Sequence, residues 1–495
     1  MSTTENLKLF YNRLSELYRL RCISALLDWD HQVYMPSGAA QARADQQEYF
    51  SITIHNKTVD PEFLRAVDEL NDVRDSLELA DQVNVREIKR QVDIERKLPE
   101  EFTAEFSQTS SLSYSAWVKA RPENDFKAVQ PYLEKLVRLN RRFCDLVGYE
   151  EHPYDALLDQ HDPGLKTSVV KPLLTGLGED LRRIIPQIAE KFEGLGELSG
   201  HFTQGSQHEL CKKVAADLGF SFEIGRLDTT AHPFMTTLGP RDFRITTRYF
   251  EDNFLRALYG TIHESGHALY EMGLPTEYAG TPMGEAISSS IHESQSRIWE
   301  NPVGRSREFC SYLSKLLPDY FHEEAKALDP EMLWRYANRV EPSLIRIEAD
   351  EVTYCQHIVI RMLLEEPLVT GDLSVSDLPA AWNEHYEKYL GIRPPDMKDG
   401  VMQDVHWYGG SLGYFPSYAL GNLYNAMMME AAHASIPGLS TQIERGDFTS
   451  MLGWLRENVH RHGMRYRGPE LIKNITGKEL SAKAFVEYLK VKFLG

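Results

Sequence analysis

Apolar residues recur at three- and four-residue spacing through most of this 495-residue chain. This spacing matches the 3.6-residue turn of the α-helix and predicts amphipathic helices. The clearest segments are residues 6–29, 129–149, 170–192, 341–366 and 420–436. No pattern of shared residues repeats at a fixed period, which argues against a solenoid. The chain is therefore predicted to be mainly α-helical.

One region departs from the helical pattern. Residues 229–250 contain Thr, Phe and Ile in rough alternation, and Leu238 to Arg241 (LGPR) has the composition of a turn. We expect one small β-sheet here, whose edge could pair with an extended peptide. A purely structural hairpin is the alternative. Residues 193–209, which contain several Gly and Ser residues, are the best candidate for a linker or loop.

The charge and the cysteine content of the chain indicate which classes of binding partner and which cellular compartment are favoured. The formal net charge is −19, so DNA, RNA and anionic membrane surfaces are poor partners. No window approaches 18 uninterrupted apolar residues, and the N-terminus lacks the apolar core of a signal peptide. The 5 cysteines are scattered and form no C-x-x-C pair, as in cytosolic proteins with reduced thiols. The sequence therefore predicts a cytoplasmic protein.

The tetrapeptide I-H-E-S occurs at residues 262–265 and again at 291–294. The first copy continues to His267 and forms the H-E-x-x-H motif. On a helix, His263 and His267 lie one turn apart on the same face and can bind one metal ion. Glu264 can then act as the general base toward a water molecule on that metal. Two unrelated surface histidines are the alternative.

The third ligand must lie elsewhere, because no H-x-x-G-x-x-H extension follows His267. The candidate carboxylates downstream are Glu271, Glu277, Glu285, Glu293 and Glu300. We expect a second helix over residues 283–300, stopped by Pro302. Glu293 lies in its middle among small residues, as suits a ligand that faces another helix. Spacing alone leaves its rivals open.

The two motifs, HESGH and IHESQSRIWEN, resemble those of the carboxypeptidase Taq family of thermostable metallocarboxypeptidases. Further blocks agree in order along essentially the whole chain: LLDWDHQVYMPSGAAQARADQ, HPF, DFRIT, RIEADEVTY, GVMQDVHW and GYFPSYALGN. The resemblance implies His263, His267 and Glu293 as ligands, with Glu264 as base. It also implies a single two-lobed domain over 1–495 with a deep cleft, similar to neurolysin and angiotensin-converting enzyme. Residues 1 to about 205 would form a helical cover, and the remainder would carry the metal site.

A carboxypeptidase must also hold the free α-carboxylate of its substrate, and burying that anion without a cation would be costly. Arg346 is the first candidate, because it resembles the family's conserved Arg and a guanidinium can bind a carboxylate through two hydrogen bonds. An i,i+4 pair with Asp350 on a helix is the alternative. Arg244 is the second candidate, although its place in a predicted strand also fits a structural salt bridge.

Three more residues come from the resemblance alone. His232 would contact the C-terminal end of the substrate, and Tyr418 would donate to the carboxylate or the oxyanion. His406 would help to stabilise the tetrahedral intermediate. Satisfied core positions are the alternative for each of them.

The sequence thus predicts a metal-dependent carboxypeptidase that acts on peptides with a free C-terminus. Its cofactor would be one divalent ion per chain, Zn²⁺ as first choice and Co²⁺ as alternative, and the resemblance implies a homodimer. An oligopeptidase or dipeptidyl carboxypeptidase with the same metal centre is the alternative enzyme. A non-catalytic helical metal-binding or scaffold protein is the alternative of another class. Against it, no cysteine lies near either I-H-E-S copy to close a structural zinc site.

Overall fold

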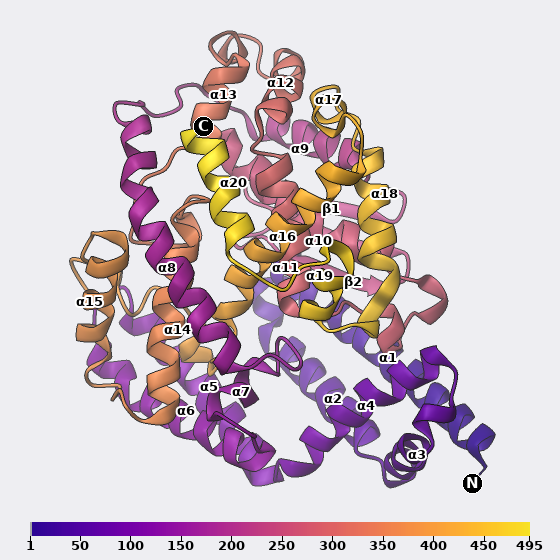
Figure 1. Cartoon of the computed structure of the whole chain (residues 1–495). Coiled ribbons are helices and arrows are strands. Elements are labelled where there is room, and N and C mark those ends of the chain that lie inside the picture. The colour runs from indigo at the N-terminus through magenta and orange to yellow at the C-terminus, as the bar shows by residue number, and fades with distance from the viewer. Residues whose placement is uncertain (1) are drawn as a thin grey trace.

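The computed structural model describes residues 2–495 and is mainly helical, as predicted (Figure 1). In chain order the first α-helices are α1 (Thr3–Val33), α2 (Ala40–Thr58), α3 (Pro61–Asp72), α4 (Leu79–Lys97), α5 (Glu100–Ala120), α6 (Phe126–Val147), α7 (Pro153–Leu158), α8 (Thr167–Ala189), α9 (Gln204–Leu218) and α10 (Phe254–Gly273). They are followed by α11 (Ser289–Ile298), α12 (Arg307–Leu316), α13 (Pro330–Ala337), α14 (Tyr354–Thr370), α15 (Leu378–Leu390), α16 (Phe415–Ser435), α17 (Leu439–Glu444), α18 (Thr449–Asn458), α19 (Gly468–Thr476) and α20 (Lys483–Leu494). Helices α10, α11 and α16 lie together near the centre of the molecule.

Four of the five predicted helical segments are confirmed as α1, α6, α8 and α16. The prediction for 341–366 is wrong in its first half, because α14 begins only at Tyr354. Before it, the Asp350 carboxylate accepts hydrogen bonds from the backbone N–H groups of Glu341, Val352 and Thr353. These bonds hold the segment in a folded loop in place of a helix.

The predicted sheet is confirmed, with one more strand than expected. Its strands are β1 (Gly225–Thr229), β2 (Met235–Gly239) and β3 (Asp242–Thr247), in the order β1-β3-β2. Strands β2 and β3 are antiparallel and connected by the predicted turn, whereas β1 runs parallel to β3 and lies almost wholly before the predicted region. Strand β3 leads into α10, and the Thr247 hydroxyl donates to the Ala257 carbonyl at 3.1 Å. The sheet is thereby fixed against α10.

The core consists of one large buried cluster, which extends from Phe102 to Phe493, and two smaller ones, around Phe10 and Phe63 and around Val83, Met283 and Met464. The candidate linker 193–209 is a loop only up to Thr203, whose hydroxyl accepts from the Ser206 N–H and begins α9. The large cluster draws residues from both sides of position 205. A division into two lobes at that position therefore stays a prediction.

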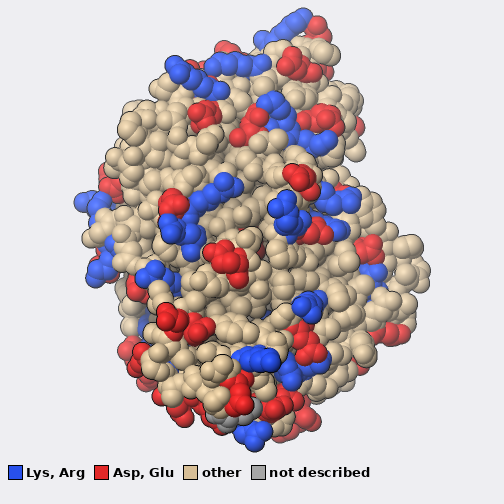
Figure 2. Space-filling model, turned by 90° about the vertical axis from the view of Figure 1, so that its right-hand side faces the viewer, with Lys and Arg blue, Asp and Glu red and all other residues tan. Residues whose placement is uncertain are grey.

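Charged side chains of both signs are interspersed over the face of the molecule in Figure 2, without a large area of one sign. This face therefore has no extended basic surface of the kind that binds nucleic acid. Among residues 2–495, no helix has the length and apolar character required to cross a membrane.

Candidate metal and catalytic site

Helices α10 and α11 supply the two I-H-E-S copies. Asn253 begins α10, because its side chain accepts from the Leu255 N–H at 3.1 Å. Helix α11 begins at Ser289, six residues later than predicted, with the Ser288 hydroxyl as N-cap. Pro302 does not stop the helical run, which continues as a π-helical turn over Trp299–Val303. The prediction of a helix over 283–300 is therefore wrong at both ends.

Two glycines allow the helices of the site to approach closely. A Cβ atom on Gly266 of α10 would lie 2.6 Å from the Gln295 carbonyl oxygen and 2.7 Å from Ser296 Cα on α11. A Cβ atom on Gly421 of α16 would lie 2.7 Å from Cγ of Glu293. Because real Cβ atoms do not approach so closely, glycine at 266 allows α11 to pack on α10, and glycine at 421 leaves room for the Glu293 side chain against α16.

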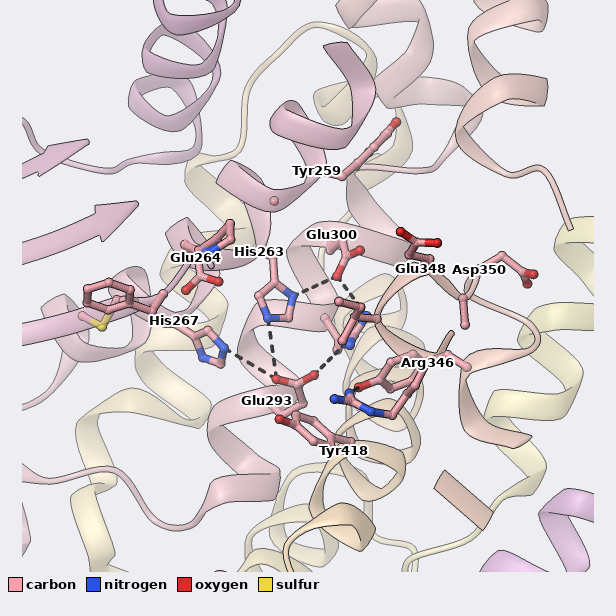
Figure 3. A pocket seen from close by; sticks show the side chains of 18 of the residues that line it. Tyr259, His263, Glu264, His267, Glu293, Glu300, Arg346, Glu348, Asp350 and Tyr418 are labelled. Carbon is pink, nitrogen blue, oxygen red and sulfur yellow. Dashed lines mark hydrogen bonds and ion pairs between the residues drawn. The ribbon is translucent and has the colours of Figure 1, made fainter. Parts of the chain in front are cut away.

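His263, His267 and Glu293 meet at one point (Figure 3). One ligand atom from each lies within 4.8 Å of the others. Nε2 of His263 is 3.8 Å from Oε2 of Glu293, and Nε2 of His267 is 3.5 Å from the same oxygen. Two imidazole nitrogens and a carboxylate oxygen match the donors of catalytic zinc sites, which leave further positions open. The donor set therefore fits a divalent cation.

Neighbouring carboxylates and an arginine orient these side chains. Nδ1 of His263 is 2.9 Å from Oε2 of Glu300, which turns Nε2 toward Glu293. Arg297 donates to Glu293 at 2.7 Å and to Glu300 at 3.1 Å. Although burial disfavours a charged imidazole, the nearby Glu293 and Glu300 carboxylates raise the pKa of His263. Such contacts fix the tautomer and the direction of a metal ligand.

Of the five candidate carboxylates, Glu293 is the one that forms a metal-binding group with both histidines. Glu300 and Glu271 contact His263 and His292 respectively. The supporting role of Glu300 was not anticipated from the sequence. Its position seven residues after Glu293, two helical turns further on, is the signal that could have revealed it.

Glu264 is buried beside His263, with 7% of its surface exposed, and lines the same cleft (Figure 3). Burial raises its pKa to about 7, although the neighbouring His263 opposes the shift. A carboxyl group with a pKa near neutrality can both accept and return a proton.

Arg346 lies in a 3₁₀ turn, Arg346–Glu348, and is 5% exposed. The predicted alternative, an i,i+4 pair with Asp350 on a helix, is wrong, because this segment is not α-helical. Nε of Arg346 instead donates to Asp404 at 2.9 Å and Nη1 donates to the Tyr354 hydroxyl at 3.1 Å. Arg361 shares Asp404, donating to its second oxygen at 2.7 Å. One carboxylate between two guanidinium groups leaves this buried cluster with excess positive charge.

Tyr418 lies on α16 and lines the cleft next to Arg346, whose guanidinium carbon is 5.3 Å from the centre of its ring. His406 lies behind it, at 6.5 Å between ring centres, and packs against Phe415. Burial lowers the pKa of His406 to about 4, and the positive charge of Arg346 adds to this effect. His406 is therefore neutral at physiological pH.

His232 and Arg244 do not line the cleft. His232 is exposed in the loop before β2, while its neighbours Pro233 and Phe234 line the cleft. Arg244 on β3 forms two hydrogen bonds of 2.9 Å to Asp242, and its guanidinium carbon is 4.2 Å from the centre of a Trp29 ring. These contacts correspond to the structural salt bridge that was the alternative for Arg244.

These groups open onto a cleft of about 2090 Å³, lined on one side by Met235, Thr236 and Thr237 of β2. This volume exceeds the range of about 300–1,000 Å³ that is usual for small-molecule pockets, so a peptide segment can be accommodated. A mainly helical body with H-E-x-x-H and a carboxylate as the third candidate ligand in such a cleft is typical of a metal-dependent peptidase.

The sequence profile of the carboxypeptidase Taq (M32) metallopeptidase family matches residues 10–493. The chain therefore belongs to this family and is a metallocarboxypeptidase, a hydrolase of peptide bonds. Membership also implies a divalent metal ion. The predicted family, fold class and enzyme class are thereby confirmed.

Three relatives illustrate the extent of the similarity. Thermostable carboxypeptidase 1 of Thermus thermophilus is 40% identical, over 98% of each chain. Carboxypeptidase 1 of Bacillus subtilis is 37% identical, over 98% of this chain and 97% of its own. The crystal structure of the M32 carboxypeptidase from Deinococcus radiodurans R1 superposes with a TM-score of 0.96 at 38% identity, over 99% of each chain.

Proposed function

We propose that His263, His267 and Glu293 hold one Zn²⁺ ion and that Glu264 is the general base in the hydrolysis of the C-terminal peptide bond. The convergence of the three ligand atoms beside a buried Glu264 is the observation that carries this proposal. When bound, the cation supplies Lewis acidity, which polarises the scissile carbonyl and makes a water molecule more acidic. Co²⁺ is the alternative, because this donor set discriminates weakly between the two metals.

Glu264 moves the protons of the reaction. Its carboxylate removes one proton from the attacking water and then delivers that proton to the nitrogen of the leaving amine. The hydroxyl of Tyr418, which lines the same cleft, donates a hydrogen bond to the oxygen that becomes negative. Neutral His406 supports the Tyr418 ring from behind.

Arg346 binds the α-carboxylate of the substrate. Its Nη2 has no hydrogen bond to any residue from 2 to 495, whereas Nε and Nη1 are held by Asp404 and Tyr354. A guanidinium fixed on one side and open on the other can bind a carboxylate with defined geometry. The excess positive charge shared with Arg361 lowers the cost of burying that anion.

The rest of the peptide is proposed to lie along β2. This strand is at the edge of the sheet, and Met235 to Thr237 line the cleft. An extended peptide can add to such an edge through backbone hydrogen bonds, which bind any sequence. The β2–β3 hairpin would then serve both as a structural element and as the peptide-binding surface.

We further propose a cytoplasmic homodimer. All 5 cysteines are free, as in a reducing compartment. Within α2, which the structure describes throughout, no residue is buried, and Tyr49 and Ile52 are 67% and 53% exposed. An exposed helix with apolar side chains is a surface on which a second subunit could pack.

The substrate class is tested with matched peptides that carry either a free or an amidated C-terminus. We expect release of single residues from the free form, at least about 100-fold faster than from the amide, because charge-assisted carboxylate contacts are worth several kcal/mol. Mass spectrometry of the products measures both rates. Equal cleavage of the two forms would contradict a carboxypeptidase mechanism, and release of dipeptides would favour the dipeptidyl alternative.

The third ligand is tested by Glu293→Ala. Loss of a ligand is expected to lower metal affinity by more than the 10–100-fold typical of supporting residues. Metal content after dialysis against a chelator measures this. Glu285→Ala is the matched control, because Glu285 lies just before α11 and does not line the cleft. Metal loss in the control but not in Glu293→Ala would refute the ligand assignment.

A further inference from the structure

Beyond the ligands themselves, we propose that Glu271 and His292 are positioning residues that determine which nitrogen of His267 carries its proton. We also propose that Thr237 couples this pair to the peptide-binding edge of β2. Glu271, His292 and Thr237 are called the relay below. The inference rests on the proposed role of His267 as a metal ligand.

The contact between the two histidines carries the argument. Nδ1 of His267 is 2.5 Å from Nδ1 of His292, and their ring centres are 4.6 Å apart. Two N–H groups cannot face each other at this distance, so one nitrogen donates and the other accepts. The direction of that bond decides the tautomers of both rings.

Glu271 sets the direction. Nε2 of His292 is 3.1 Å from Oε1 of Glu271, and an ionised carboxylate only accepts hydrogen bonds. Nε2 of His292 is therefore protonated, and its Nδ1 offers a lone pair in the neutral ring. His267 must then donate from Nδ1, which leaves its Nε2 unprotonated. This is the nitrogen that lies 3.5 Å from Glu293, where the cation would be held.

The two ligand histidines are thus oriented by different means. Nδ1 of His263 contacts the Glu300 carboxylate directly, whereas Nδ1 of His267 reaches a carboxylate only through a second imidazole. The second I-H-E-S copy therefore supplies both a ligand, Glu293, and the partner that orients another ligand, His292.

Thr237 extends the relay to the cleft wall. Its hydroxyl donates to Oε2 of Glu271 at 3.1 Å, and its backbone pairs with Phe243 in the sheet. Thr237 and Glu271 both line the cleft. A peptide that adds to β2 would consequently contact the strand that holds Glu271 in place. Three hydrogen bonds in series connect Thr237 of this strand to His267.

The test uses the full chain and measures metal binding in addition to activity. His292→Phe keeps a ring but removes both nitrogens, and its affinity for Zn²⁺ is expected to fall about 10–100-fold, as for other supporting residues of metal sites. His292→Asn places an acceptor oxygen near the position of Nδ1 and is expected to recover most of the affinity. Chelator competition gives the affinities. The visible absorption spectrum of the Co²⁺ form, which reports ligand geometry, should shift in His292→Phe and return toward wild type in His292→Asn.

Affinity of His292→Phe within twofold of wild type, or equal loss in the Phe and Asn variants, would overturn the inference. Thr237→Val, which removes only the hydroxyl, provides a variant that preserves the packing of His292. Binding of a non-cleaved peptide analogue should change the Co²⁺ spectrum of Thr237→Val differently from that of the wild type. The same spectral change in both proteins would overturn the coupling to β2. If Glu293→Ala leaves metal affinity unchanged, the ligand assignment fails. If Glu293→Ala lowers metal affinity but the His292 variants leave it unchanged, only the relay fails.

Discussion

Replacing Glu264 by Gln is expected to lower kcat by about 10²–10⁴-fold, the usual contribution of a general base. Gln has the same shape as Glu, but its amide cannot take a proton from water. Metal content should stay at the wild-type level, because Glu264 is not in the group formed by His263, His267 and Glu293. Steady-state kinetics with a free-carboxylate peptide and elemental analysis of the purified variant measure the two quantities.

Glu277→Gln is the matched control for this change. Glu277 is exposed in the 3₁₀ turn after α10 and does not line the cleft, so the same carboxylate-to-amide change should leave kcat near wild type. If Glu264→Gln retained more than about a tenth of wild-type activity, well outside the range for a general base, Glu264 would not be the proton acceptor.

Arg346→Met is expected to lower kcat/KM for free-carboxylate peptides by about 30- to 1,000-fold, equivalent to the roughly 2–4 kcal/mol of a buried charged contact. Met fills part of the volume but cannot bind an anion. Most of the loss should appear as a higher KM, because the carboxylate is bound in the ground state as well as in the transition state. Cleavage of the amidated peptide, already slow, should change little, so the preference for a free C-terminus should collapse.

Arg244→Met separates the two predicted arginines. Because Arg244 pairs with Asp242 and packs on Trp29, its loss should reduce stability without altering the ratio of free to amidated cleavage. Thermal unfolding and the same pair of peptides provide both readouts. If the ratio collapsed in Arg244→Met and persisted in Arg346→Met, the carboxylate would be bound by Arg244.

The spacing of residues in the sequence was sufficient to predict which side chains lie together when they are one helical turn apart. His263 and His267 share a face because any α-helix brings residues four apart together, and α10 bears this out. Periodicity failed for 341–353, where apolar spacing resembled that of a helix. There the Asp350 carboxylate takes up three backbone N–H groups, and a side chain that competes for N–H groups is not visible in apolar spacing.

Spacing could not decide among five carboxylates for the third ligand, whereas the tertiary structure places Glu293 in one group with His263 and His267. The choice depends on how α11 crosses α10 and α16, and the glycines at 266 and 421 permit that crossing. The same holds for Arg346, whose direction is set by Asp404, 58 residues further along the chain. Neither the packing around Glu293 nor the contact between Arg346 and Asp404 can be predicted from the spacing of apolar residues along the chain.

The sequence by itself determined the helical class, the small sheet and the placing of His263 and His267 on one helical face, because each depends on residues a few positions apart. The tertiary structure decided the surroundings of Glu293, the Arg346 cluster and the contact between His267 and His292. Those contacts join helices and loops that are far apart along the chain, and only packing of the whole chain brings their side chains within a few ångströms.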